Sequence, residues 1–242
     1  MPPWSVPQVF LIVLRMIRRQ PLALLLSLAA LPALWSVPAE LAYHQWFPDA
    51  AAETGPSRPS AAFTASFAIV IWNSVWAAGT TRIGIDAARG LPVRFRHLLD
   101  GVSYTPLMVC TALPLLPIEL LALLPRDEDT AYLPLLFGAV LVVTVVLLLR
   151  TALWVPFVVD AGTSLRAGLV ASWEATRDHA GQILLLALLL VLPLLPLAVL
   201  ELATFTRAYI AIGLTGLFYT LAVGKLYVLA HDPAQPSFLR AS

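Results

Sequence analysis

Long apolar runs with almost no charge constrain this chain more than any other feature. The run 131–159 carries one charged residue, and so do the runs 22–41 and 209–229. A helix of about 20 apolar residues crosses the hydrocarbon core of a bilayer, which is roughly 30 Å thick. Because 60% of the 242 residues are hydrophobic and only 12% are charged, far from the composition of soluble domains, we expect an integral membrane protein.

Six apolar segments are predicted to be transmembrane helices. They are 22–41, 61–83, 103–124, 131–159, 181–202 and 209–229. The amphipathic segment 6–20 has too few apolar residues to cross a bilayer and is predicted to lie along its surface. The expected fold class is therefore all-α, a polytopic integral membrane protein whose residues 1–242 form a single membrane domain.

One sequence pattern occurs twice. In each copy an apolar segment ends in an Asp-Ala pair, at Asp86 and Asp160, and an amphipathic stretch follows. A second apolar run then ends in Leu-Pro-Leu-Leu-Pro. The two copies, about 61–124 and 131–202, predict an internal repeat. We expect the two aspartates to cap helices or to pair with nearby arginines.

The amphipathic stretch in each copy predicts an interfacial helix. In the first copy, apolar residues at helical spacing alternate with basic ones after Asp86. In the second copy Ser164 is a plausible N-cap. There we expect Leu165, Leu169 and Trp173 to share one face of the helix, while the opposite face carries charged residues. Those residues are Arg166, Glu174 and Arg177.

The distribution of basic residues predicts the orientation of the chain. With a cytoplasmic N-terminus, twelve of the fifteen lysines and arginines fall on the cytoplasmic side, so the positive-inside rule places both termini there. We expect the bacterial cytoplasmic (inner) membrane. Both interfacial helices then lie at the cytoplasmic face, and the two copies run in the same direction as parallel repeats about an axis along the membrane normal. Their basic side chains are possible contacts for anionic lipid. These are Arg94, Arg96, Arg166 and Arg177.

Proline pairs mark the third and fifth predicted spans. Each proline removes a backbone donor and frees a carbonyl one turn earlier, so both helices are expected to kink. The kinks are either packed bends, which membrane helices commonly contain, or a hinge or ligand pocket. Two polar residues, one a carboxylate, are candidates for the same region. The full candidate set is Asn73, Pro114, Pro117, Glu119, Pro193 and Pro196.

No pattern in the sequence indicates catalysis. His97 and His179 each have an acid close by, Asp100 and Asp178, but nothing supplies the spacing of a metal site, so we expect solvated histidines at the interface. Motifs such as GxSxG, GxGxxG and the phosphate-binding loop are absent from the sequence. We therefore expect a non-enzyme without cofactor or metal. The net charge of +1 gives no reason to expect nucleic acid as a partner.

Two segments of the repeat carry a family resemblance. RIGIDAARGLPVRFRHLLDG and DAGTSLRAGLVASWEATRDHAGQILLLALLL resemble the six-helix bacterial membrane domain that precedes some glycerophosphodiester phosphodiesterases, and related stand-alone membrane families of unassigned function. The resemblance covers about 15–229, and its most recognisable parts are the Ala-Arg-Gly turn and the Ser-Trp-x-x-Thr-Arg helix. It implies the six-span fold and a supporting role in the membrane, without phosphodiesterase activity.

The functional expectation follows from a clear membrane architecture without a chemical motif. We expect a scaffold or accessory subunit of a membrane complex. Its expected partners are membrane lipids and other membrane protein subunits, or further copies of the chain in a homo-oligomer. The alternative is a transporter or lipid-handling protein with a site between the proline-kinked third and fifth helices.

Overall fold

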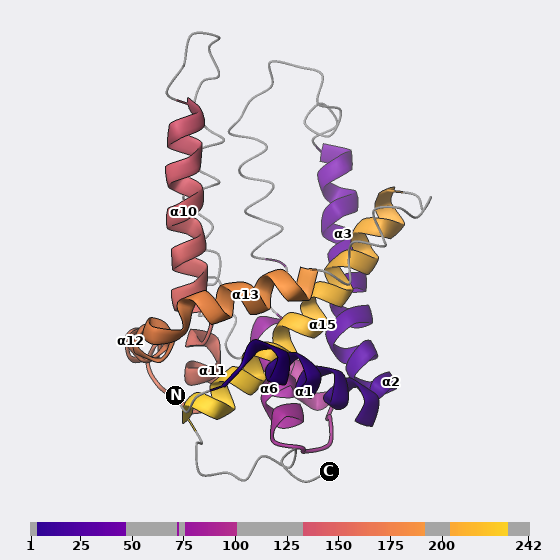
Figure 1. Ribbon diagram of the computed structural model, residues 1–242. Coiled ribbons are helices and arrows are strands. Elements are labelled where there is room, and N and C mark those ends of the chain that lie inside the picture. The colour runs from indigo at the N-terminus through magenta and orange to yellow at the C-terminus, as the bar shows by residue number, and fades with distance from the viewer. Residues whose placement is uncertain (1–3, 47–71, 73–75, 101–132, 192–203, 232–242) are drawn as a thin grey trace.

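The computed structural model describes residues 4–46, 72, 76–100, 133–191 and 204–231. Every regular element in these ranges is a helix, which confirms the all-α class for this part of the chain. Figure 1 shows two helices, α3 (Leu31–Trp46) and α10 (Leu133–Thr151), rising in the same direction from a layer of helices that lie across them. That layer contains most of the buried contacts described below.

The N-terminal helix α1 (Val6–Arg19) belongs to this layer and matches the predicted segment 6–20. The Ser5 amide donates to Oε1 of Gln8 (3.2 Å) at its start, and Pro21 follows its end. One face of the helix is buried in the core, at residues spaced three and four apart. This face consists of Val6, Val9, Val13 and Met16. The opposite face carries Arg15, Arg18 and Arg19, which are exposed.

After α1 the chain turns upward through α2 (Pro21–Leu24), the π-helix η1 (Leu25–Ala30) and α3. The side chain of Gln20 links the start of this rise to a distant loop. Its Nε2 donates to the Leu91 carbonyl (3.1 Å), and its Oε1 accepts from the Val93 amide (2.8 Å). One glutamine thus satisfies two backbone groups that no helix would pair.

The helix α6 (Ala77–Ala88) ends in a glycine turn that the sequence dictates. The Leu91 amide donates to the Asp86 carbonyl (2.8 Å) and the Gly90 amide to the Ala87 carbonyl (3.1 Å), which is a Schellman arrangement. Gly90 has φ 78°, a value that side chains disfavour. The next helix, α7, spans Arg96–Asp100 within the described residues and packs its backbone against Gly79 of α6.

The described part of the predicted span 131–159, residues 133–159, is helical but broken near its end. Residues 152 and 153 form a turn between α10 and α11 (Trp154–Val159), because Pro156 cannot donate to the carbonyl four residues earlier. Ser172 bridges the break: its Oγ donates to the Arg150 carbonyl (2.7 Å) and accepts from the Leu153 amide (3.1 Å). A side chain from another helix therefore replaces the lost helical bonds.

Helix α12 (Leu165–Thr176) has the predicted N-cap, since Oγ of Ser164 accepts from the Ala167 amide at 3.3 Å. Its predicted faces are partly wrong. The side packed against α11 is formed by small residues, Gly168, Ser172 and Thr176. Trp173 is 47% exposed and lies on the outer side with the arginines, because the close packing of the small residues leaves no room for an indole ring.

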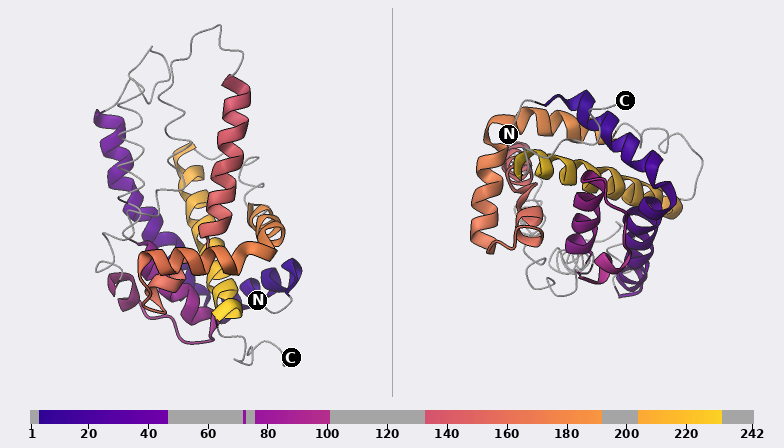
Figure 2. Two further views of the ribbon diagram at one scale, coloured as in Figure 1. Left: turned by 90° about the vertical axis from the view of Figure 1, so that its left-hand side faces the viewer. Right: turned by 90° about the horizontal axis from the view of Figure 1, so that it is seen from below.

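The short 3₁₀ helix η4 (Arg177–His179) leads from α12 into α13 (Ala180–Val191), which lies across the direction of α10 (Figures 1 and 2). It covers the described half of the predicted span 181–202. The remaining half, like most of 61–83 and all of 103–124, lies outside the described residues.

Helix α15 (Thr204–His231) runs through the centre of the molecule and supplies much of the core (Figure 1). It crosses α6 at glycines: a Cβ on Gly224 would lie 2.5 Å from the carbonyl carbon and oxygen of Gly84. Small residues at a crossing let two backbones approach closely, which is a main source of helix association in membranes.

By length and composition, two helices in the described ranges could cross a membrane. One is Leu135–Val159, counted through its turn, with a mean hydropathy of 2.4, and the other is Gly213–His231, with 1.4. In the most apolar part of the first only 11% of the residues are buried, against 61% in the second. The first thus presents apolar side chains outward, whereas the second is a core helix. The predicted number of six spans stays a prediction.

The glycine crossing gives a testable expectation. Gly224→Ala places a methyl group against immobile backbone of α6, and overpacking of about 1–3 kcal/mol lowers the melting temperature by roughly 2–12 °C. Gly138→Ala is the matched control, because nothing lies within 4 Å of its added Cβ in α10. This control should be neutral or slightly stabilising. Thermal unfolding of the detergent-purified variants measures both, and equal shifts would contradict the close crossing.

Candidate functional site

The most prominent polar cluster among the described residues joins both copies of the predicted repeat to α15. Nη1 and Nη2 of Arg89, at the end of α6, donate to Oδ1 and Oδ2 of Asp160, at the end of α11, each at 2.7 Å. The two side chains are 19% and 18% exposed. Two parallel charge-assisted bonds in a partly buried place form a strong and directional contact. Arg89 comes from the first copy and Asp160 from the second.

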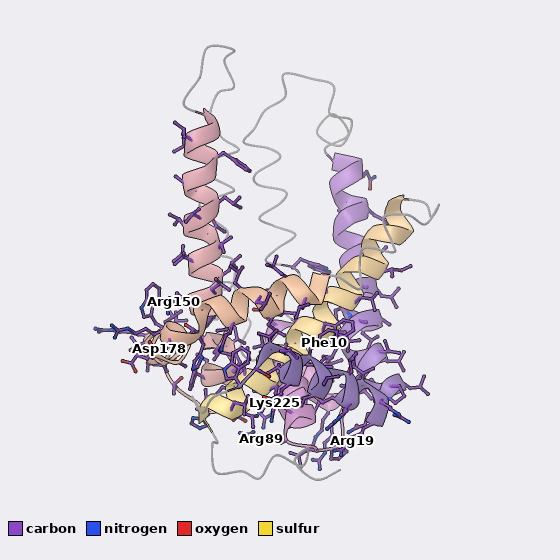
Figure 3. All side chains as sticks on the ribbon, in the orientation of Figure 1. Phe10, Arg19, Arg89, Arg150, Asp178 and Lys225 are labelled. Atoms are coloured by element: carbon purple, nitrogen blue, oxygen red, sulfur yellow. The ribbon has the colours of Figure 1, made fainter. Side chains whose placement is uncertain are left out.

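Aromatic residues of α15 complete this cluster. The Tyr227 hydroxyl donates to Oδ2 of Asp160 (2.9 Å), and the tyrosine is fully buried. Its ring stacks on His231, with centroids 5.3 Å apart and planes at 17°, and meets the edge of Phe157 at 5.1 Å. Lys225, two residues before Tyr227, is 2% exposed. Figure 3 shows Lys225 and Arg89 near the same end of the molecule.

The environment of Asp160 sets its protonation. The carboxyl lies one residue beyond the apolar segment Leu135–Val159. Burial raises its pKa, but the hydrogen bonds from Arg89 and Tyr227 and the positive charges of Arg89 and His231 lower it by more. The net result is a pKa below the ordinary value, so Asp160 is an anion at neutral pH. These contacts hold the ends of α6 and α11 and the helix α15 together.

A second pair lies within the first copy. Nδ1 of His97 in α7 lies 2.8 Å from Oδ2 of Asp86 in α6, and the two side chains are 11% and 14% exposed. The prediction of a solvated His97 is therefore wrong, because α7 packs back onto α6 and buries the ring. The expectation that the aspartates pair with arginines is confirmed for Asp160, whereas the partner of Asp86 is a histidine.

The second histidine differs from the first. His179 is partly buried, its Nδ1 lies 3.0 Å from Oε1 of Gln182, and its ring lies 5.8 Å from that of Trp4. Asp178 beside it is exposed. The similar positions of the two histidines in the repeat therefore do not give them similar surroundings.

The candidate hinge or ligand residues cannot be placed, because all of them lie outside the described residues. They are Asn73, Pro114, Pro117, Glu119, Pro193 and Pro196. The four arginines predicted to contact anionic lipid are described, and each is exposed. Arg94 precedes α7 and Arg96 begins it, while Arg166 and Arg177 lie on the outer side of α12.

A scan against protein-family models, a search of curated proteins and a search of solved structures each found no match. The resemblance to the six-helix bacterial membrane domain therefore stays a prediction from the sequence.

Sequence reasoning missed the part of the cluster that α15 contributes. Tyr227 and His231 lie four residues apart on one helix face, a spacing that brings their rings together. The stacked pair reaches Asp160 only because α15 crosses α6 and α11. A tyrosine and a histidine at this spacing, near the polar end of an apolar helix, were the signal in the sequence that could have indicated this contribution of α15.

We expect the Arg89–Asp160 pair to contribute measurably to stability. Either Arg89→Gln or Asp160→Asn leaves one charge partly buried without its partner and costs about 2–3 kcal/mol, while the double variant recovers part of that loss. Arg96→Gln, an exposed arginine nearby, is the control and should be close to neutral. Thermal unfolding of the four variants measures the coupling, and strictly additive losses would contradict it.

The lowered pKa of Asp160 predicts acid sensitivity. Because this pKa is lower in the folded than in the unfolded protein, the pair's stabilisation is fully present above the unfolded value near 4. It is lost as the pH falls through the folded value. The melting temperature of the wild type should therefore drop more steeply below pH 4 than that of Asp160→Asn. Parallel curves for the two proteins would show that Asp160 does not titrate as expected.

Proposed function

We propose that this chain is a non-enzymatic, polytopic membrane protein that acts as a scaffold or accessory subunit of a membrane complex. The proposed topology has six spans with both termini in the cytoplasm of a bacterium, and the layer containing α1, α7 and α12 lies at the cytoplasmic face of the inner membrane. The exposed arginines of that layer support this orientation.

The observation that carries the proposal is the outward apolar surface of α10. Leu135, Gly138 and Val142 follow one another along one face of this helix, and Leu135 and Val142 are 79% and 63% exposed. Gly138, between them, has open space above its Cβ position. A bulky apolar face next to an open glycine is a surface on which a second transmembrane helix packs closely. We therefore assign this face to a partner subunit.

The polar cluster supports a structural role. Asp160 is bonded to both Arg89 and Tyr227, so its charge and that of Arg89 serve to hold α6, α11 and α15 together. A transporter site needs polar groups that can exchange partners with a substrate. The alternative, a transporter or lipid-handling protein with a site between the kinked helices, stays a prediction, because its residues lie outside the described ranges.

A site-specific photo-crosslinker tests the partner face. Placed at Val142 in cells, it should form an adduct with another membrane protein or with a second copy, seen as a shift in mass. The same group at Thr144, which is 1% exposed on the same helix, is the matched control and should give no adduct. Chromatography in mild detergent is the second measurement. A Val142 variant without protein adducts, together with a protein that runs only as a partner-free monomer, would overturn the proposal.

A further inference from the structure

The outer side of α12 carries a stripe that combines cations with apolar side chains. Arg166, Val170, Trp173 and Arg177 follow at spacings of four, three and four residues, which places them along one face of a helix. All four are exposed. This face points away from the small residues that pack against α11. The acids Glu174 and Asp178 are offset to one side of the stripe.

Arg150 adds a third cation at the centre of this stripe. It lies at the foot of α10, as Figure 3 shows, and its guanidinium carbon is 5.3 Å from the centre of the Trp173 ring. Its Nη1 is buried and has no hydrogen-bond partner among the described residues. Burying part of a guanidinium without an acceptor is costly, and the indole face offsets only some of that cost. A bound anion would supply an acceptor for this atom.

Apolar surface continues upward from the cation. Ala139, Val143 and Val146 lie on the same face of α10 as Arg150, and the two valines are 50% and 43% exposed. Figure 2 shows α10 standing upright above the transverse α12. An anionic group held at Arg150 would therefore have an apolar track directly above it. The partner face proposed above, with Gly138 and Val142, lies next to this track around α10.

We propose that Arg150, Trp173 and the stripe of α12 form a binding site for one anionic phospholipid of the cytoplasmic leaflet. Its phosphate binds the guanidinium groups, whose planar fork suits phosphate oxygens, while Trp173 lies at the level of the headgroup and the acyl chains lie along Val143 and Val146. The inference rests on the proposed membrane insertion and orientation. It adds a discrete site to the general attraction between basic residues and anionic lipid.

The site belongs to the second copy of the repeat alone. Asp86 and Asp160 are 74 positions apart, and the same offset places Trp76 where the second copy has Arg150. The first copy thus lacks this cation. We expect one tightly bound lipid per chain rather than two.

Native mass spectrometry of the full chain in mild detergent tests the site. The wild type, titrated with phosphatidylglycerol, should retain one lipid more tightly than it retains phosphatidylcholine. Arg150→Gln should bind that lipid about tenfold more weakly, the effect of losing a hydrogen-bonded charge. The double variant Arg166→Gln/Arg177→Gln, which changes exposed residues only, should also weaken binding and guards against misfolding of the first. The matched control Arg18→Gln/Arg19→Gln removes the same charge from α1 and should leave the retained lipid unchanged.

Three outcomes would overturn the inference. The first is equal retention of phosphatidylcholine and phosphatidylglycerol. The second is unchanged lipid binding in both Arg150→Gln and Arg166→Gln/Arg177→Gln. The third is displacement of the lipid by inorganic phosphate at equal concentration, which would identify a site for free phosphate. Extraction of membranes with carbonate distinguishes a failure of the lipid site from a failure of the proposed function. A protein that stays in the membrane and keeps its Val142 adduct, but loses no lipid in either Arg150→Gln or Arg166→Gln/Arg177→Gln, would refute the lipid site alone. A protein released by carbonate would refute the membrane proposal itself.

Discussion

The bond between Arg89 and Asp160 is the interaction on which the described structure depends most. It joins the ends of two helices, α6 and α11, that are 71 residues apart in the sequence, and the Tyr227 hydroxyl fixes both to α15. Burial of apolar side chains gives little specificity between helices in a bilayer, since lipid offers similar apolar contacts. A directional polar bond at the helix ends, together with the glycine crossing of α6 and α15, supplies the specificity that apolar side chains lack.

The predicted internal repeat would account for the positions of the polar groups in the sequence but not for how they pair. At the offset of 74 positions that relates Asp86 to Asp160, the counterpart of Arg89 is Thr163. Thr163 cannot form an ion pair, and its hydroxyl donates to the Phe157 carbonyl (2.9 Å). Asp86 therefore lacks the symmetric partner and lies instead beside His97. The two copies start from one pattern and differ in the contacts that bind each to the rest of the chain.

Local signals in the sequence predicted local structure well. The cap at Ser164 and the extent of α1 were predictable because each depends on residues within one turn. The burial of His97 and the outward position of Trp173 were not, because both follow from how closely a neighbouring backbone approaches. Gly79 and Gly168 allow those approaches, and a periodic pattern of apolar residues cannot show them. The predicted proline site lies outside the described residues.

Among the described residues, charged groups that are bonded to each other and a charged group that lacks an acceptor lie in different parts of the protein. Within the cluster around Asp160 the charges are bonded to each other, so that region has little capacity to bind anything else. At the foot of α10 the reverse holds: Arg150 has a buried Nη1 without an acceptor among the described residues and lies over an exposed indole ring. In the proposed orientation a membrane would supply both an anion and apolar chains there. Arg89 is bonded to Asp160, whereas Nη1 of Arg150 has no acceptor among the described residues. We therefore expect the protein's interactions along α10 and α12 rather than at its polar core.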